Sequence, residues 1–127
     1  MMKRLDLTNK IIDRKKQLHI TVENLAKLSG VSIRTVNRVL KNEDVKLSTI
    51  EDITNLLGLD FAGNEQIPLQ ELKRQRAHEK ALYLTSLVQS TSALEMQGLD
   101  DDNLNSIISM YEKEFLNGAY KNTLWVA

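Results

Sequence analysis

The pattern of apolar and polar positions is helical along the whole chain, because apolar residues recur three and four positions apart and no segment alternates as a strand does. In the first half this spacing predicts four helices. The first carries Leu5, Ile11, Ile12 and Leu18; the second runs from Val22 to Ser29; the third turns Val36, Val39 and Leu40 to one face; the fourth does the same with Ile50, Ile53, Leu56 and Leu57.

Residues that favour helix ends agree with these helices. Thr21 and Ser32 precede the second and third helices, where a side-chain oxygen can accept a hydrogen bond from a free backbone N–H. Gly30 follows the second helix and can adopt the left-handed conformation of a tight turn. The sequence therefore predicts two short helices joined by a glycine turn.

The fourth helix has a predicted start, end and exit. Ser48 and Glu51 form a capping-box pattern, so we expect Ser48 to cap this helix. Gly58 is expected to close it. Leu59 and Phe61 are then expected to return to the core.

A composition shift marks the domain boundary near residue 65. The only proline, Pro68, follows the small polar stretch 62–66, so we predict a domain at 1–64 and a second at 65–127. The second is predicted to be a helical hairpin, with one helix ending at Gly98 and another at Asn117-Gly118. Its predicted apolar positions are Leu69, Leu72, Ala77, Ala81, Leu84, Leu87, Val88 and Leu94, then Leu104, Ile107, Ile108, Tyr111 and Phe115.

This reading gives an all-α fold. Two helices cannot bury both their faces alone, so the hairpin must pack on the first domain, on a second copy or on another protein. With 127 residues, 42% hydrophobic and 27% charged, the chain has an ordinary globular composition. It lacks cysteine, a secretory leader pattern and an apolar stretch of membrane-spanning length, so we expect a cytoplasmic protein with no membrane association.

Charge is unevenly distributed although the net charge is zero. Residues 1–64 carry 11 Lys and Arg against 8 Asp and Glu, whereas residues 65–127 carry 6 against 9. Within residues 1–46 the basic residues number 11 and the acidic residues 5. Such a run is usually a solvated face, but it also suits a nucleic-acid partner.

One spacing carries the functional argument. Two short helices that cross steeply need a small residue where their axes meet, and Ala26 supplies it. Gly30 makes the turn four positions later, Val31 fills the angle between the helices, and Val36 packs the second helix on the first.

This segment resembles the helix-turn-helix of the lambda-repressor and Cro-like (XRE-type) superfamily, and the resemblance covers about residues 5–61, including Leu57-Gly58-Leu59 at the end of a following helix. Residues 31–40 are also similar to sugar-operon repressors of the lactose-repressor type. Those proteins start almost at the motif and append a large sugar-binding domain, which argues against them here. The resemblance implies a sequence-specific, DNA-binding transcriptional regulator whose partner is double-stranded DNA.

With Val36 and Val39 turned inward, the outer side of the third helix would enter a major groove. Arg34 or Arg38 can bond guanine, Asn37 can bond adenine, and Ile33 can contact a thymine methyl, although both arginines can equally be solvated. The predicted base-reading residues are Ser32, Ile33, Arg34, Asn37 and Arg38. The predicted phosphate contacts are Thr21, Thr35, Lys41, Asn42, Lys46 and Ser48.

A site of this size reads few base pairs, so we expect a homodimeric repressor on a two-fold operator. The hairpin is the expected dimer surface, with Trp125 either anchoring it or packing in the core. One alternative is an antitoxin whose residues 65–127 bind and neutralise a protein partner, with DNA binding for autoregulation. Another is a protein-binding adaptor without DNA affinity.

No pattern indicates catalysis, a metal or a cofactor. His19 and His78 lack acidic or histidine neighbours at ligand spacing, so they are expected to be structural or surface residues. The run Asp100–Asp102 lacks the alternation of a calcium loop and better fits the start of a helix. We therefore expect neither an enzyme nor a metalloprotein.

Overall fold

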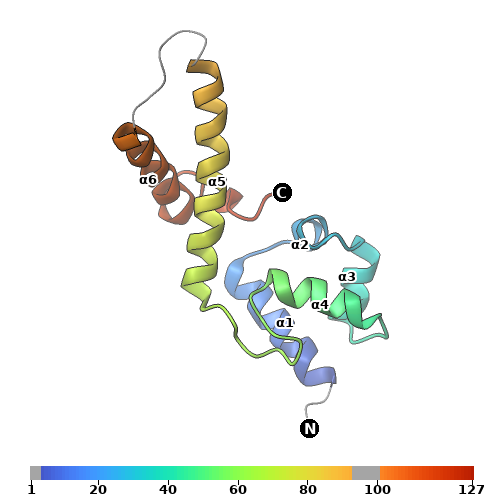
Figure 1. Ribbon diagram of the computed structural model, residues 1–127. Coiled ribbons are helices and arrows are strands. Elements are labelled where there is room, and N and C mark those ends of the chain that lie inside the picture. Colours follow the sequence, from blue (N-terminus) through green and yellow to red (C-terminus); the bar gives the residue numbers. More distant parts are fainter. Residues whose placement is uncertain (1–3, 93–100) are drawn as a thin grey trace. The chain divides into compact units, whose positions relative to one another are not determined.

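The computed structural model describes residues 4–92 and 101–127, and the residues described are helical with no strand (Figure 1). The chain divides into two compact units. One contains the residues up to Leu72 together with Trp125–Ala127, and the other contains Lys73–Leu124. The predicted all-α fold is confirmed.

The first unit holds four helices, which confirms the four predicted from the apolar spacing: α1 (Arg4–Leu18), α2 (Val22–Ser29), α3 (Ile33–Leu40) and α4 (Leu47–Leu56). Helix α2 packs on both α3 and α4, and α1 packs on α3. The largest fully buried apolar side chains come from all four helices and the exit from α4: Ile11, Leu18, Leu25, Val36, Val39, Ile53 and Leu57.

The predicted ends of α2 and α3 are confirmed. Thr21 Oγ1 accepts a hydrogen bond from Asn24 N at 3.2 Å, and Ser32 Oγ accepts one from Thr35 N at 3.2 Å. Gly30 follows α2 in the left-handed conformation, with φ of 73°, and its N–H donates to the carbonyl of Ala26. These local bonds satisfy backbone groups that a helix end leaves free.

The predicted cap of α4 is wrong. The helix begins at Leu47, with Lys46 at the N-cap position and no side-chain cap bond. Thr49 N and Ile50 N both donate to the carbonyl of Lys46, so Ser48 already lies in the first helical turn. A residue inside that turn no longer has the extended backbone that an N-cap requires.

After α4, Gly58 (φ 72°) turns the chain and Leu59 is buried, as predicted, but Phe61 is 57% exposed. The expectation that Phe61 returns to the core is therefore wrong. The cause is a tight turn in which Asp60 Oδ1 accepts from Ala62 N at 2.9 Å and from Asn64 N at 2.8 Å. The bond from Asn64 N lowers the pKa of the Asp60 carboxyl. This turn places residue 61 at its exposed tip.

The second unit is built on α5, whose full span is Leu69–Ser92, and on α6 (Asp101–Asn117), with a short 3₁₀ helix, η1, at Lys121–Thr123. Figure 1 shows α6 beside the middle of α5, and a bond between His78 Nδ1 and Glu112 Oε1 at 2.6 Å joins them. On α5, Ala77, Ala81 and Thr85 are buried. The helical hairpin predicted after Pro68 is confirmed.

Part of the predicted apolar stripe of the hairpin is at the surface. Leu87 is 48% exposed, so it does not belong to the buried face. The predicted positions Leu94, Gly98 and Asp100 lie outside the described residues. Trp125 is only 6% exposed and groups with the first unit, which fits core packing.

Candidate nucleic-acid interface

The contact between α2 and α3 depends on the residues predicted to make it. Ala26 is 4% exposed, Val36 is fully buried and Val31 is half-buried between the two helices. Val31 N donates to the carbonyl of Ala26 at 3.1 Å, so the chain turns directly over the small residue. A larger side chain at position 26 would separate the helices.

Helix α3 has one fully buried side, formed by Val36 and Val39. Much of the rest of its surface is exposed, with Ile33 at 48%. A single exposed isoleucine is ordinary on a solvated helix, but here it lies beside polar residues on a surface that suits the apolar edges of bases. All five predicted base-reading residues are exposed: Ser32, Ile33, Arg34, Asn37 and Arg38.

Two of these side chains already have partners in the protein. Ser32 Oγ donates to Thr35 Oγ1 at 2.8 Å while it caps α3. Arg38 Nη2 donates to the carbonyl of Asp44 at 2.7 Å, and Arg38 Nε lies 3.5 Å from Glu43 Oε2. The side-chain contacts of Arg38 were not predicted, because its partners lie in the turn that follows α3.

Arg34 and Asn37 differ from Arg38 in this respect. Within residues 4–92 and 101–127, no hydrogen bond or ion pair engages either side chain. Arg34 and Asn37 therefore keep their full set of donors, and Asn37 its acceptor, on the exposed side of α3.

Among the predicted phosphate contacts, Thr35 is half-buried. The other five are exposed: Thr21, Lys41, Asn42, Lys46 and Ser48. Thr21 lies at the start of α2, Thr35 lies within α3, and the others lie between the end of α3 and the first turn of α4. Asn42 has a positive φ of 60°, and its Oδ1 accepts a hydrogen bond from Thr8 Oγ1 at 3.0 Å. This bond from α1 fixes the turn that carries Lys41 and Lys46.

The second unit contains polar contacts that the sequence did not predict. His78 was expected to be a structural or surface residue, and it is exposed with the carboxylate of Glu112 beside it. Lys80 Nζ donates to the carbonyl of Thr123 at 2.9 Å and lies 5.7 Å from the ring centre of Phe115. Burial, followed by the charge of Arg76, lowers the pKa of Lys80. These contacts hold α6 and η1 on α5.

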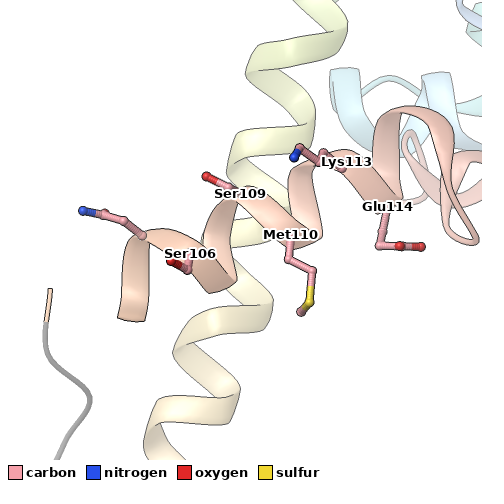
Figure 2. Close-up of a pocket in the computed structure, with 6 residues that line it drawn as sticks. Ser106, Ser109, Met110, Lys113 and Glu114 are labelled. Carbon is pink, nitrogen blue, oxygen red and sulfur yellow. The ribbon is translucent and has the colours of Figure 1, made fainter. Parts of the chain in front are cut away.

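Figure 2 shows a hollow beside α6, with labelled residues that all come from this one helix. Its lining residues are Asn105, Ser106, Ser109, Met110, Lys113 and Glu114. None of them is buried, so the hollow offers no enclosed polar group that would orient a small ligand.

The described residues contain no group of three or more His, Asp or Glu side chains placed to hold a metal ion. None of their helices combines the length and the apolar character needed to cross a bilayer.

Comparison with known proteins supports the first unit as a DNA-binding domain. Residues 11–64 match a family model described as a helix-turn-helix. No curated protein and no solved structure matched the chain. The matched segment runs from the middle of α1 through α2, α3 and α4 to the turn after α4. Residues 11–64 are therefore a helix-turn-helix DNA-binding domain of the lambda-repressor and Cro-like (XRE) type.

Proposed function

We propose that the protein is a homodimeric repressor that binds a two-fold operator through the exposed side of α3. The observation that carries this proposal is the division of α3 into a buried side, Val36 and Val39, and an exposed side with Ile33, Arg34 and Asn37. An amide, a guanidinium and an apolar side chain can together distinguish base pairs in a major groove.

Basic charge supports DNA as the partner. Eleven Lys and Arg occupy residues 1–46 against five acidic residues, and Lys41 and Lys46 lie on the turn that follows α3. Cations beside the groove would neutralise phosphates and set the register of α3, without reading sequence themselves. We also propose that the protein acts in the cytoplasm, on chromosomal DNA, and is not an enzyme.

Dimerisation is supported by the second unit. Leu82 and Tyr83 on α5 are 44% and 65% exposed, and Met110 on α6 is 50% exposed. Leu82 and Tyr83 are consecutive, and a contiguous exposed apolar surface on a small domain often marks a protein interface. A second copy of the chain would bury these apolar side chains. It would also bring a second recognition helix, which could bind the second half-site of the operator.

The test is selection of bound duplexes from a random DNA library with the full-length protein. We expect enrichment of an inverted repeat whose half-sites lie about one helical turn apart. A reporter with this sequence over its promoter should then lose expression when the protein is present. If no sequence is enriched, the proposal of a sequence-specific regulator is wrong. If the enriched sequence has no two-fold symmetry, the proposal of a homodimer is wrong.

The same exposed residues on α5 and α6 also support a second candidate, an antitoxin whose second unit binds a protein toxin. The two candidates differ in the mass of the purified protein. A stable homodimer supports the repressor, whereas a monomer that becomes soluble and stable only with the product of an adjacent reading frame supports the antitoxin.

A further inference from the structure

We infer that Arg38 is a positioning residue, which fixes the turn between α3 and α4 so that Lys41 and Lys46 meet the DNA backbone, and that it does not read a base. The inference rests on the proposed function. It changes the role of one residue on the exposed side of α3 and leaves base reading to its neighbours.

Arg38 holds the turn through both its backbone and its side chain. Its carbonyl accepts a hydrogen bond from Glu43 N at 2.9 Å. Its guanidinium donates through Nη2 to the carbonyl of Asp44 at 2.7 Å and lies with Nε 3.5 Å from Glu43 Oε2. A single residue at the end of α3 therefore contacts two consecutive residues of the turn.

The turn is also held from its other side. Thr8, which is 2% exposed in α1, donates to Asn42 Oδ1, and Asn42 N donates to the carbonyl of Val39. Asn42 keeps a left-handed backbone, a conformation that asparagine tolerates better than most residues with a Cβ atom. Contacts from α1 and from Arg38 together give the turn one conformation.

The conformation of this turn sets the positions of two lysine residues. Lys41 directly follows α3, and Lys46 occupies the N-cap position of α4. Both are exposed, and the residues between them are fixed by Thr8 and Arg38. A phosphate contact at a defined spacing from the recognition helix requires a turn of this kind.

Base reading by the Nε–Nη2 edge of Arg38 would disrupt the arrangement. A guanidinium reads guanine with two N–H groups on one edge, and in Arg38 the edge formed by Nε and Nη2 faces the turn. Moving it into the groove would leave the carboxylate of Glu43 without this cation, beside a phosphate backbone that repels it. Arg34, one turn earlier on α3, has no such attachment among the described residues.

The experiment compares the full-length wild type with Arg38→Gln, Arg38→Lys and Arg34→Gln on the selected operator and on all its single-base-pair variants, at several salt concentrations. Arg34→Gln is the matched control, because it removes the same charge from the same helix. Arg38→Gln should weaken binding to every sequence by a similar factor, about tenfold, and keep the base preferences. Arg34→Gln should lose preference at one base pair.

Coupling to the turn separates positioning from simple loss of charge. The effects of Arg38→Gln and Lys46→Gln on affinity should be non-additive, because one acts through the other. Arg38→Lys keeps the charge but cannot reproduce the two contacts, so it should show the same coupling and the same unchanged base preference. In the free protein, both Arg38 variants should shift the amide resonances of Glu43 and Asp44 and keep the helical circular dichroism.

Loss of preference at a single base pair in Arg38→Gln, with effects that add to those of Lys46→Gln, would overturn the inference and leave the repressor proposal intact. If either Arg38 variant fails to fold, the other variant is combined with Lys46→Gln and tested for non-additive effects in the same way. A wild-type protein that enriches no sequence would instead overturn the proposed function, and the inference with it.

Discussion

The guanidinium of Arg14 in α1 binds the carboxylate of Glu65, with 2.7 Å between Nη1 and Oε1, at the point where the chain leaves the DNA-binding domain. Arg14 is 5% exposed and also donates to the carbonyls of Leu57 and Ile67. Glu65 Oε1 in turn accepts from Leu69 N at 3.2 Å, at the start of α5. One buried arginine therefore fastens the exit from α4 and the first turn of α5 to α1.

Replacing Arg14 with Gln should lower the free energy of unfolding by about 2–4 kcal/mol, because a buried and a part-buried carbonyl each lose a donor at roughly 1–3 kcal/mol. Chemical denaturation followed by circular dichroism measures the loss. Arg14→Lys is the control, since it keeps the charge but supplies one compact ammonium in place of the planar guanidinium. Its free energy of unfolding should lie between those of the wild type and Arg14→Gln. A Gln variant as stable as the wild type would contradict this role.

The Arg14–Glu65 contact should also make stability depend on pH. The hydrogen bond from Arg14 holds the pKa of the Glu65 carboxyl below its ordinary value. A lowered pKa in the folded state means that the carboxylate stabilises the fold fully above the unfolded value of 4.5, and that this contribution disappears as pH falls through the folded pKa.

The measurement is the difference in melting temperature between the wild type and Glu65→Gln across pH. This difference should be largest near neutral pH and should shrink in acid below 4.5. Glu51→Gln, which changes an exposed carboxylate on α4, serves as the control. A gap between the wild type and Glu65→Gln that stays constant down to pH 3 would show that the ion pair is not linked to folding.

The sequence predicted the helices of the first unit well because their signals are local. Thr21, Ser32 and Gly30 act on backbone groups within a few residues, and the spacing of Val36 and Val39 specifies one buried face. Ser48 was misassigned because its residue type favours a cap, whereas the cap position is taken by Lys46, which makes no side-chain cap bond.

Contacts between distant residues could not be predicted in the same way. The buried role of Arg14 depends on carbonyls about 40 to 50 positions away, and carbonyls carry no residue-specific signal. His78 meets Glu112 only because α6 folds back on α5. At the DNA interface, the exposed side of α3 followed from periodicity, but the bond from Arg38 to the Asp44 carbonyl required the path of the turn.

Gly30→Ala should destabilise the domain by about 1–2 kcal/mol, since φ of 73° is unfavourable for a residue with a Cβ atom. No atom lies within 4 Å of the position that this Cβ would take, so the cost comes from the backbone alone. Gly30→Asn should cost less, because asparagine tolerates this conformation better. Thermal unfolding of both variants checks the order, and an equal loss in both would indicate a different cause.

Asn37→Ala should relax the preference for one base pair in each half-site by about 1–3 kcal/mol and leave the helix content unchanged. Asn37 is exposed on α3 and has no bond within the described residues, so its removal takes nothing from the fold. Binding to a panel of single-base-pair operator variants measures the effect, and circular dichroism is the control. Loss of helicity, or an unchanged preference, would count against base reading by this residue.

Tyr83→Glu should convert the proposed homodimer to a monomer, because a charge on a 65% exposed tyrosine of α5 would be buried if a second copy covered it. Phe61→Glu is the matched control, since this phenylalanine is 57% exposed and belongs to the first unit. Light scattering gives the mass of each variant.

Operator binding extends this test to function. The Tyr83→Glu monomer should bind one half-site as well as the wild type does but lose much of its affinity for the full inverted repeat, because the two readers are no longer joined. Phe61→Glu should keep both the mass and the affinity of the wild type. If Tyr83→Glu stays dimeric while Phe61→Glu dissociates, the dimer surface lies on the DNA-binding domain, and the exposed residues of α5 serve another partner.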